Sequence, residues 1–439
     1  MYQKEYQRKM IRPEDGVMMI ESGHHVVLGG GPIEPFAFVE KMTLLKDKVK
    51  NVKVTSILSL KPHEIMTRPE YKEVFDFEAC FYSPVQRVTD RLGMGSHTPT
   101  HLRNSGTNII RLDADPDVYV CTVSPMDKNG FFTTGPGVIY DYEMIHNAKK
   151  VIFEVSSQFP RTFGDTVFHI SQVDHLYEVD RPVPAIPDAP ITEVDKRIGQ
   201  YVAELIPDGS TIQLGIGAIP NAAAKELINK KDLGIHTEML NDAMVDLYYS
   251  GVITGRKKTF FPNKIVTSFS MGTQKVYDFI DDNPLVMHFR SNYTNNPFIV
   301  SQNDNMVSVN TTLMVDFTGQ CASEAIKNVQ ISGTGGQVET AIGAQMAKGG
   351  KSIITLHSTA DIKQPGTDQL KRVSKIVPFF DRGTIITLAR TDVEYVITEY
   401  GIASLKGASI KNRTKQLIEI AHPDFREELT EEAKKNNFI

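Results

Sequence analysis

Short apolar runs rich in β-branched residues alternate along this chain with longer stretches of helical periodicity. Three of the runs are VIFEV at residues 151–155, SIITL at residues 352–356 and TIITL at residues 384–388. Apolar runs of this length without an alternating polar face are typical of strands buried on both faces of a parallel sheet. The pattern therefore predicts three buried strands in an α/β protein.

A glycine-rich turn joins a strand to a helix near the middle of the chain. Residues 211–214 (TIQL) predict a strand, residues 215–217 (GIG) a turn, and residues 220–230 a helix with Pro220 in its first turn. Strand, tight turn, helix and strand in succession indicate an open α/β sheet. Ligands of such sheets bind outside the carboxyl ends of the strands, so we expect the site at turns that follow strands.

An internal repeat divides the sequence into two related halves. Residues 20–40 align with 206–226 at an offset of 186, and residues 118–130 align with 307–319 at an offset of 189. The identical pairs are Ile20/Ile206, Gly23/Gly209, Leu28/Leu214, Gly29/Gly215, Gly31/Gly217, Ile33/Ile219, Ala37/Ala223, Glu40/Glu226, Val118/Val307, Val120/Val309, Thr122/Thr311, Asp127/Asp316 and Gly130/Gly319. Because the order is kept and the offsets nearly agree, we predict an α/β fold of two similar open domains that arose by duplication.

Prolines gather at the point where a duplicated chain needs a joint. They are Pro182, Pro184, Pro187 and Pro190. Proline-rich segments act as extended spacers. We therefore expect an N-terminal domain at residues 1–182, a linker at residues 183–190, and an enlarged C-terminal domain at residues 191–439.

Composition and charge narrow the class of protein. Lys and Arg number 48 against 53 Asp and Glu, which gives a net charge of -5 and no electrostatic signature of binding to nucleic acid or to an anionic membrane. The first residues contain no apolar leader, and no apolar run approaches the length of a membrane span. The three cysteines are Cys80, Cys121 and Cys321, too far apart for a CxxC motif or a disulfide framework. We expect a cytoplasmic protein.

The common nucleotide and metal motifs are incomplete or absent. A dinucleotide fingerprint needs a third glycine, but Glu34 and Pro220 stand at that position in the two GxG turns. Gln345 stands where a phosphate loop ending at Gly350-Lys-Ser would need its first glycine. No HExxH, Cys/His zinc spacing or GxSxG motif is present. Dehydrogenase, kinase, zinc hydrolase and serine hydrolase are therefore disfavoured, and no metal is expected.

Once these motifs are set aside, the candidate functional features of the sequence are two glycine-rich turns and two glutamates. Residues 213–217 (QLGIG) and 332–337 (SGTGGQ) can each direct peptide N–H groups into a cleft, where such groups bind anions or stabilise an oxyanion. The alternative is that both are ordinary turns without a ligand.

One glutamate stands among apolar residues in the segment LGIHTEML, residues 233–240. Gly234 is expected to end the preceding helix, and the residues after it alternate as a short strand that ends near Glu238. The first half has Ser56 or a neighbour at the corresponding place, so only the second half carries this carboxylate. Glu399 likewise follows an apolar strand. For both glutamates, a solvated residue at a strand end is the alternative.

Seven motifs occur in an order that resembles the acetyl-CoA hydrolase/transferase family. They are LGIGAIPNA, DLGIHTEM, MVDFTGQ, SGTGGQ, VSKIVPF, VITEYGIASLKG and IAHPDFREEL, and the likeness runs from about residue 15 to about residue 430. The resemblance implies two similar open α/β domains with the active site in the cleft between them, assembled into a homo-oligomer, either a dimer or a tetramer. It also implies that Glu238 is the catalytic glutamate. The CoA contacts that it implies are Gln213, Leu214, Gly215, Ile216, Gly217, Leu313, Gly335 and Gly336.

The activity that the resemblance implies is transfer of CoA from a short-chain acyl-CoA, such as 4-hydroxybutyryl-CoA or butyryl-CoA, to a carboxylate such as acetate. Glu238 would attack the thioester, and the peptide N–H groups of Ile216 and Gly335 would stabilise the oxyanion, without any cofactor beyond the CoA substrates. Glu399 in TEYG is a rival, because a glutamate in an ENG motif is the nucleophile of a different CoA-transferase family. Two other functions stay open: an acyl-CoA hydrolase that uses the same glutamate, and a CoA-binding protein without activity.

Overall fold

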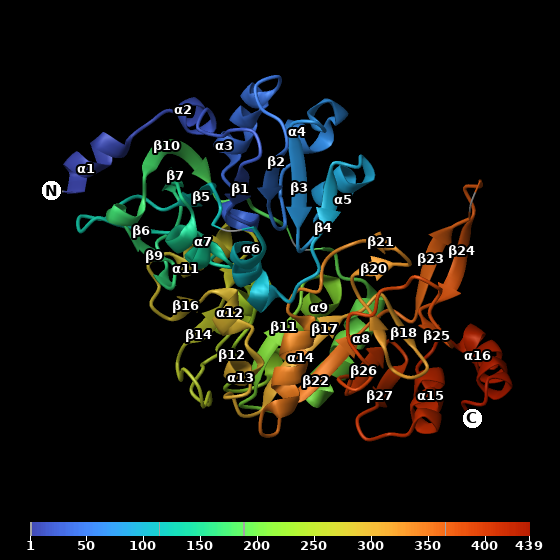
Figure 1. Ribbon diagram of the computed structural model, residues 1–439. Coiled ribbons are helices and arrows are strands. Elements are labelled where there is room, and N and C mark those ends of the chain that lie inside the picture. The colour runs from blue at the N-terminus through green and yellow to red at the C-terminus, as the bar shows by residue number, and fades with distance from the viewer. Residues whose placement is uncertain (1, 114, 188, 365) are drawn as a thin grey trace.

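Two largely parallel β-sheets, one from each half of the chain, form the framework of this computed structural model (Figure 1). The structure describes residues 2–113, 115–187, 189–364 and 366–439. The first sheet has the strand order β10-β7-β5-β1-β2-β3-β4, and the second has the order β12-β11-β17-β22-β26-β27. The strands of the first sheet are β1 (His25–Leu28), β2 (Val52–Thr55), β3 (Phe75–Ala79), β4 (Gly95–His97), β5 (Val118–Val123), β7 (Val151–Gln158) and β10 (His175–Pro182). Those of the second are β11 (Thr211–Leu214), β12 (Gly234–Ile235), β17 (Met306–Thr311), β22 (Lys351–Thr355), β26 (Tyr395–Thr398) and β27 (Gly401–Ser404).

The two sheets share one strand order over five strands. In the first half β2-β1-β5-β7-β10 lie side by side, and in the second half β12-β11-β17-β22-β26 do, with every pair parallel. The strands β1 and β11, and likewise β5 and β17, come from the segments that align in the sequence repeat. The expected α/β fold of two open sheets is confirmed, and the common order is consistent with the predicted duplication.

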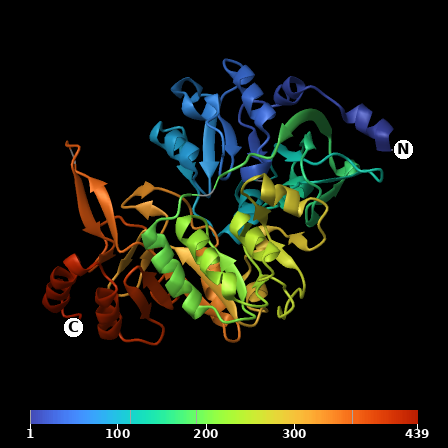
Figure 2. The same ribbon diagram turned by 180° about the vertical axis from the view of Figure 1, so that it is seen from behind.

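Helices cover the faces of both sheets. In the first half they are α1 (Tyr2–Lys9), α2 (Pro13–Val17), α3 (Phe36–Lys41), α4 (Glu64–Thr67), α5 (Pro84–Arg91), α6 (Ser105–Asp113) and α7 (Asp141–Asn147). In the second they are α8 (Glu193–Leu205), α9 (Ala218–Glu226), α10 (Asp242–Tyr249), α11 (Gln274–Ile280), α12 (Ser291–Thr294), α13 (Pro297–Val300), α14 (Gln337–Met346), α15 (Ile410–Glu419) and α16 (Pro423–Lys435). Figure 1 shows α14 on one side of the second sheet, and Figure 2 shows α8 and α9 on the other. Among the described helices, none combines the length and the apolar character that a membrane span requires.

In the described chain six small sheets accompany the two main ones, and one of the six contains strands from both halves. They are formed by β14 (Ile265–Thr267) with β16 (Val286–His288) and β8 (Phe163–Gly164); β13 (Met239–Leu240) with β15 (Phe269–Ser270); β18 (Met314–Asp316) with β19 (Cys321–Ala322) and β25 (Ile376–Val377); β20 (Ala325–Ile326) with β21 (Val329–Gln330); β23 (Thr359–Lys363) with β24 (Leu370–Ser374); and β6 (Phe131–Thr133) with β9 (Val167–His169). The strand β8 belongs to the first half of the chain, whereas its partner β16 belongs to the second. The two halves therefore share backbone hydrogen bonds across the expected linker.

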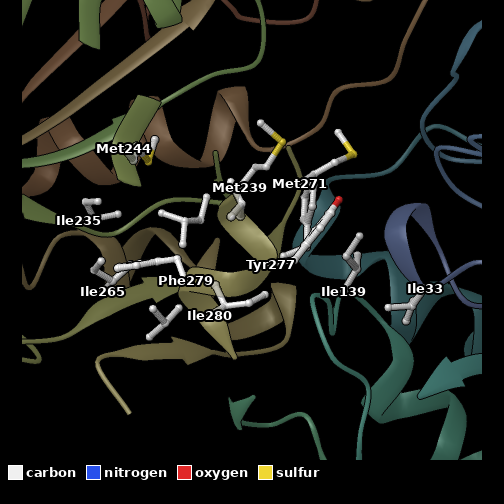
Figure 3. Packing of buried hydrophobic residues seen from close by; sticks show 14 of the residues in the cluster. Ile33, Ile139, Ile235, Met239, Met244, Ile265, Met271, Tyr277, Phe279 and Ile280 are labelled. Atoms are coloured by element: carbon white, nitrogen blue, oxygen red, sulfur yellow. The ribbon is translucent and has the colours of Figure 1, made fainter. Parts of the chain in front are cut away.

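A single hydrophobic cluster continues across the same boundary (Figure 3). Ile33 and Ile139 from the first half lie in it together with Met239, Met271 and Tyr277 from the second. Burial of apolar side chains on this scale is the main stabilising contribution to a fold. Because the cluster joins both halves, it holds fixed the surfaces between which the site described below is formed.

Three of the four strands expected from the apolar pattern are present, as β7, β11 and β22. The prediction of a buried strand at residues 384–388 is wrong. Ile385 and Ile386 are 43% and 39% exposed, and Leu388 alone makes a single bridge, with Cys321. The segment lies beside β19 instead, where Leu388 and Cys321 exchange backbone hydrogen bonds, and it joins neither edge strand of the six-stranded sheet, β12 or β27.

The turn and helix after β11 lie close to the expected limits. The helix α9 begins at Ala218 rather than Pro220 and ends at Glu226, and a 3₁₀ turn at Leu227–Asn229 follows it. The prediction that Gly234 ends this helix is wrong, because Gly234 opens β12 and the left-handed residue before it is Asp232, with φ of 56°. Glycine is required at this position for another reason, since a Cβ there would overlap the Lys258 side chain.

Candidate active site

Glu238 lies where the chain leaves the six-stranded sheet. The strand β12 ends shortly before it, and β13 begins immediately after it in a different, two-stranded sheet. The Glu238 carbonyl oxygen accepts hydrogen bonds from the peptide N–H groups of Ser268 and Phe269 at 3.0 and 3.1 Å. The backbone is therefore fixed at this residue, and its side chain takes a defined direction.

The Glu238 carboxylate is held by two donors. Asn295 Nδ2 donates a hydrogen bond to Glu238 Oε2 at 2.8 Å, and the peptide N–H of Gly336 acts on the same carboxylate. The side chain is half-buried, because one side of it opens onto a cavity. Burial raises the pKa of Glu238 to about 7, against the lowering effect of both donors. A desolvated carboxylate with a raised pKa is typical of a group that takes part in chemistry.

The position of Asn295 is fixed by its surroundings. Asn295 follows α12 and is fully buried, and the residue before it is held by His236 of the HTEM segment. The ring of His236 bonds through Nε2 to the carbonyl oxygen of Thr294 at 2.8 Å, and Asn303 contacts its Nδ1 at 3.3 Å. Burial lowers the pKa of His236 to about 3, so the ring is neutral. We conclude that His236 positions the end of α12, and with it the amide that contacts Glu238.

The cavity above Glu238 has a volume of about 380 Å³ and is lined by both halves of the chain. The first half contributes Leu58, Phe81, Tyr82, Ser83, Pro84 and Arg87. The second half contributes Gln213, Leu214, Gly215, Ile216, Glu238, Met239, Met271, Asn310, Thr311, Ser323, Ile331, Ser332, Gly333, Thr334, Gly335, Gly336 and Gln337. The cavity thus lies between the two sheets, at the turns after β3, β11 and β17.

A smaller apolar cavity adjoins the first at Glu238. Its lining residues are Ile57, Leu58, Phe81, Leu102, Ile139, Ile216, Glu238 and Phe269. Within this lining Glu238 is the one ionisable side chain. The carboxylate therefore stands between a large cavity lined by polar and apolar side chains and a small pocket with apolar walls.

The two glycine turns approach Glu238 from different elements. Gly335 has φ of 54°, a left-handed conformation that favours glycine, and a Cβ at Gly333 would overlap the Cys80 carbonyl oxygen of the first half. Ile216, 47% exposed, also lines the cavity. In the part of the chain that the structure describes, the peptide N–H groups of Ile216 and Gly335 have no hydrogen-bond acceptor.

The structure brings together most of the residues singled out from the sequence. Gln213, Leu214, Gly215, Ile216, Glu238, Gly335 and Gly336 all line the cavity. Gly217 does not line it; with φ of 124° it precedes the first residue of α9. Leu313 does not line it either, since it lies between β17 and β18 and its N–H donates to the Ala322 carbonyl oxygen at 3.1 Å.

Glu399 is placed apart from this cavity. It follows β26 as the sequence indicates, but its two carboxylate oxygens accept hydrogen bonds from Ser358, from the peptide N–H at 3.0 Å and from Oγ at 2.6 Å. These contacts fix the turn after β22. In this geometry the Glu399 carboxylate binds the turn after β22, outside the cavity.

Several residues of the site carry no signal in the sequence alone. Asn295 lies in an unremarkable polar stretch, 57 positions from the glutamate that it contacts. The loop after β3, with Phe81 and Tyr82 at the cavity wall, reaches the site only because the two sheets face each other. The residues Ser83 and Pro84 at the start of α5 predict the beginning of a helix and give no sign of a site.

Comparison with known proteins gives full-length relatives. Residues 1–187 match the acetyl-CoA hydrolase/transferase N-terminal domain, and residues 272–433 match the C-terminal domain. A succinyl-CoA:cyclohexane-1-carboxylate CoA transferase of Geobacter metallireducens is 40% identical over 100% of this chain and 98% of its own length. A 4-hydroxybutyrate coenzyme A transferase of Clostridium kluyveri is 40% identical over 98% of both chains. The crystal structure of RipA from Yersinia pestis superimposes with a TM-score of 0.91 at 34% identity, covering both chains completely.

The fold and the cavity define an α/β enzyme with a desolvated carboxylate between two sheets. The chain belongs to the acetyl-CoA hydrolase/transferase family, since both domains of that family match it. Within the family it is a CoA-transferase, as its full-length relatives are. Relatives named for hydrolysis are more distant: an acetyl-CoA hydrolase of Yarrowia lipolytica is 26% identical over 71% of this chain and 64% of its own length.

Proposed function

We propose that this enzyme moves CoA from a short-chain acyl-CoA, 4-hydroxybutyryl-CoA or butyryl-CoA, to a free carboxylate such as acetate, with Glu238 as the covalent carrier. The observation that carries the proposal is the Glu238 carboxylate, which is held by Asn295 and Gly336 and opens onto a cavity of about 380 Å³ lined by both halves of the chain. A cavity of this kind admits the thioester end of an acyl-CoA to the carboxylate. The likeness to a 4-hydroxybutyrate coenzyme A transferase supports the choice of acyl group.

The proposed reaction proceeds through two covalent intermediates on Glu238. A carboxylate oxygen attacks the thioester carbonyl carbon, the C–S bond breaks, and an acyl-glutamyl anhydride and CoA thiolate result. The thiolate then attacks the glutamyl carbonyl carbon, which releases the acyl group as a carboxylate and leaves a glutamyl-CoA thioester. The acceptor carboxylate attacks that thioester, and the same two steps run in reverse. Glu238 supplies the nucleophile and the acyl-CoA substrate supplies the thiolate. The proposed reaction therefore uses no metal or organic cofactor.

Three donors are available for the oxyanions of this sequence. In the proposal the peptide N–H groups of Ile216 and Gly335 bond the oxygen of the substrate carbonyl. Asn295 Nδ2 already donates to Glu238 Oε2, so it remains bonded to that oxygen when charge develops on it. Each such donor accounts for about 10²–10³ in rate in enzymes where one has been removed.

The apolar side chains around Glu238 select the acyl group in this proposal. They are Ile57, Leu102, Ile139 and Phe269, together with Leu58, Phe81 and Ile216, which also line the larger cavity. Apolar walls favour a short alkyl chain and disfavour an acyl group that carries a second charge. Such a pocket also keeps water from the anhydride, whose hydrolysis would end the transfer. We further propose a homo-oligomer, either a dimer or a tetramer.

Kinetics at varied donor and acceptor concentrations test the covalent carrier. We expect parallel double-reciprocal lines for butyryl-CoA and acetate, because CoA stays on the enzyme after the first carboxylate has left. The same assay with a thiol reagent separates transfer from hydrolysis: a transferase forms acetyl-CoA and releases little free CoA. Intersecting lines would indicate direct transfer in a ternary complex, and release of free thiol that does not depend on acetate would indicate a hydrolase.

The pH dependence follows from the raised pKa of the nucleophile. Glu238 must be ionised to attack, and burial raises its pKa to about 7, so we expect kcat/KM for butyryl-CoA to fall tenfold for each unit of pH below that value. An exposed glutamate, with a pKa of about 4.3, would lose half of the activity only when the pH falls to that value. The measurement is kcat/KM between about pH 5 and about pH 9. A flat profile down to about pH 5 would contradict the assignment of Glu238 as a desolvated nucleophile.

A further inference from the structure

A buried polar cluster lies beneath the cavity, between the second sheet and α14. Its four side chains, all buried, are Gln213 of β11, Ser308 and Asn310 of β17, and Thr340 of α14. Gln213 and Ser308 are partners in the parallel register of β11 and β17, and Asn310 lies two residues further along the same face of β17. Gln213 and Asn310 also line the cavity, so the cluster leads from the cavity wall into the contact between sheet and helix.

Hydrogen bonds join the four side chains into a chain that ends at the Gly336 carbonyl oxygen. Gln213 Nε2 reaches Asn310 Oδ1 at 3.5 Å, and Asn310 Nδ2 donates to Ser308 Oγ at 2.9 Å and to Thr340 Oγ1 at 3.1 Å. Ser308 Oγ donates to Gln213 Oε1 at 2.9 Å and also lies 3.0 Å from Thr340 Oγ1. Thr340 Oγ1 donates to the Gly336 carbonyl oxygen at 2.9 Å. Each hydroxyl proton thus has an acceptor, and the bonds fix the orientation of every member.

This chain of bonds connects the two glycine turns of the site. Gln213 stands at the end of β11, just before the turn that contains Ile216, and Gly336 follows Gly335 in the other turn. The Gly336 N–H also acts on the Glu238 carboxylate. Apolar side chains of the same shape would pack a helix on a sheet about as stably, whereas hydrogen bonds add a fixed direction. The cluster therefore sets how the two turns are oriented toward each other.

We propose that Thr340 and Ser308 are positioning residues of the transfer reaction, whose hydroxyls hold the Gly336 peptide and the end of β11 so that the donors of both turns face the reacting atoms. Neither hydroxyl contacts the substrate. Thr340 acts through Gly336, whose N–H acts on the Glu238 carboxylate, and Ser308 acts through Gln213. The inference rests on the proposed function, because it concerns the donors of that reaction.

Removal of either hydroxyl should lower kcat and leave KM for butyryl-CoA nearly unchanged. Thr340→Val keeps the shape of the side chain but removes one donor to the Gly336 carbonyl and one acceptor of Asn310 Nδ2, so kcat should fall about 10- to 100-fold. Thr340→Ser restores the hydroxyl and should recover most of the rate. Ser308→Ala should also lower kcat. The double variant should lose less than the product of the two factors, because both hydroxyls belong to one chain of bonds.

The acid limb of the pH profile separates positioning from a merely structural role. The Gly336 N–H lowers the pKa of Glu238, so a Gly336 peptide that turns away lets this pKa rise. The acid limb of kcat/KM should then move to higher pH by about one unit in Thr340→Val. The titratable groups that face Glu238 are Glu339 of α14 and the Cys80 thiol after β3, and the substitution changes neither.

The experiment is the pH profile of kcat and kcat/KM for wild type, Thr340→Val, Thr340→Ser, Ser308→Ala and the double variant, with mass spectrometry of the glutamyl-CoA adduct. Thr414→Val is the matched control. Thr414 is a buried threonine of α15 that donates to the Phe317 carbonyl oxygen at 3.3 Å, outside the cavity. Its substitution should lower the thermal midpoint, because that bond is lost, and leave the acid limb in place.

The outcomes separate this inference from the function on which it rests. Absence of an adduct on wild-type Glu238 would overturn the proposed function and the inference with it. With the adduct present, the positioning role is overturned by a folded Thr340→Val protein that keeps either the wild-type kcat or the wild-type acid limb. An equal shift of the acid limb in Thr414→Val would overturn it as well. If Thr340→Val does not fold, Ser308→Ala is judged by the same two measurements.

Discussion

Glu238→Ala is expected to lower CoA transfer by a factor on the order of 10⁴ or more, because it removes the atom that would form both covalent bonds. The fold should survive the change. The Glu238 backbone keeps its bonds to Ser268 and Phe269, and loss of a half-buried carboxylate removes a desolvation cost. We therefore expect a thermal midpoint equal to or above that of the wild type. Steady-state rates and calorimetry on the same preparations measure both effects.

Glu399→Ala is the matched control for this substitution. It removes a carboxylate that also follows a strand, but one bonded to Ser358 outside the cavity. Glu399→Ala should lower stability, because the peptide N–H and the hydroxyl of Ser358 lose their acceptor. It should retain most of the transfer activity. Incubation with acyl-CoA alone, followed by borohydride, should place the modification on the peptide around residues 232–239. If Glu399→Ala abolishes transfer and Glu238→Ala does not, the nucleophile is Glu399.

Local pattern was sufficient for the strand, the turn and the helix from Thr211 to Glu226, whereas the strand expected to end near Glu238 is shorter and covers only Gly234–Ile235. From Thr211 to Glu226 the signal lies within a few residues: a buried apolar run and glycines at the turn. The repeat also gave the paired sheets, because the aligned segments became β1 and β11. The proposal that Glu238 is catalytic came from the resemblance to a family and from no local pattern.

The contacts that tune Glu238 could not be predicted in this way. Asn295 follows α12 and Gly336 precedes α14, and a contact with elements so far apart in sequence depends on how the sheets pack. The wrong strand at residues 384–388 has the same cause. Its apolar residues satisfy the pattern of a buried strand, but whether a strand forms depends on the partner that tertiary packing brings to the segment, and here that partner is Cys321 of the short strand β19.

Gly336→Ala is expected to lower transfer by about 100-fold while the protein still folds. A Cβ at Gly336 would overlap both Glu238 Oε2 and Asn295 Nδ2, so the nucleophile and its donor must move apart or turn. The backbone can accept the change, because φ of -97° at Gly336 is ordinary for alanine. The loss should appear in kcat and in the rate of adduct formation, since the substitution displaces the reacting carboxylate itself.

Gly137→Ala is the control that separates this displacement from a general effect of filling a glycine. Gly137 also lies at the contact between the two halves, where it bridges to Phe269, but a Cβ there would stand 3.4 Å from the nearest atom, Phe269 Cβ. That is ordinary van der Waals contact, so we expect near wild-type transfer and an unchanged thermal midpoint. Equal losses in both variants would indicate that tightening the contact between the halves is the cause. Full activity in Gly336→Ala would show that the Glu238–Asn295 geometry is not required for the reaction.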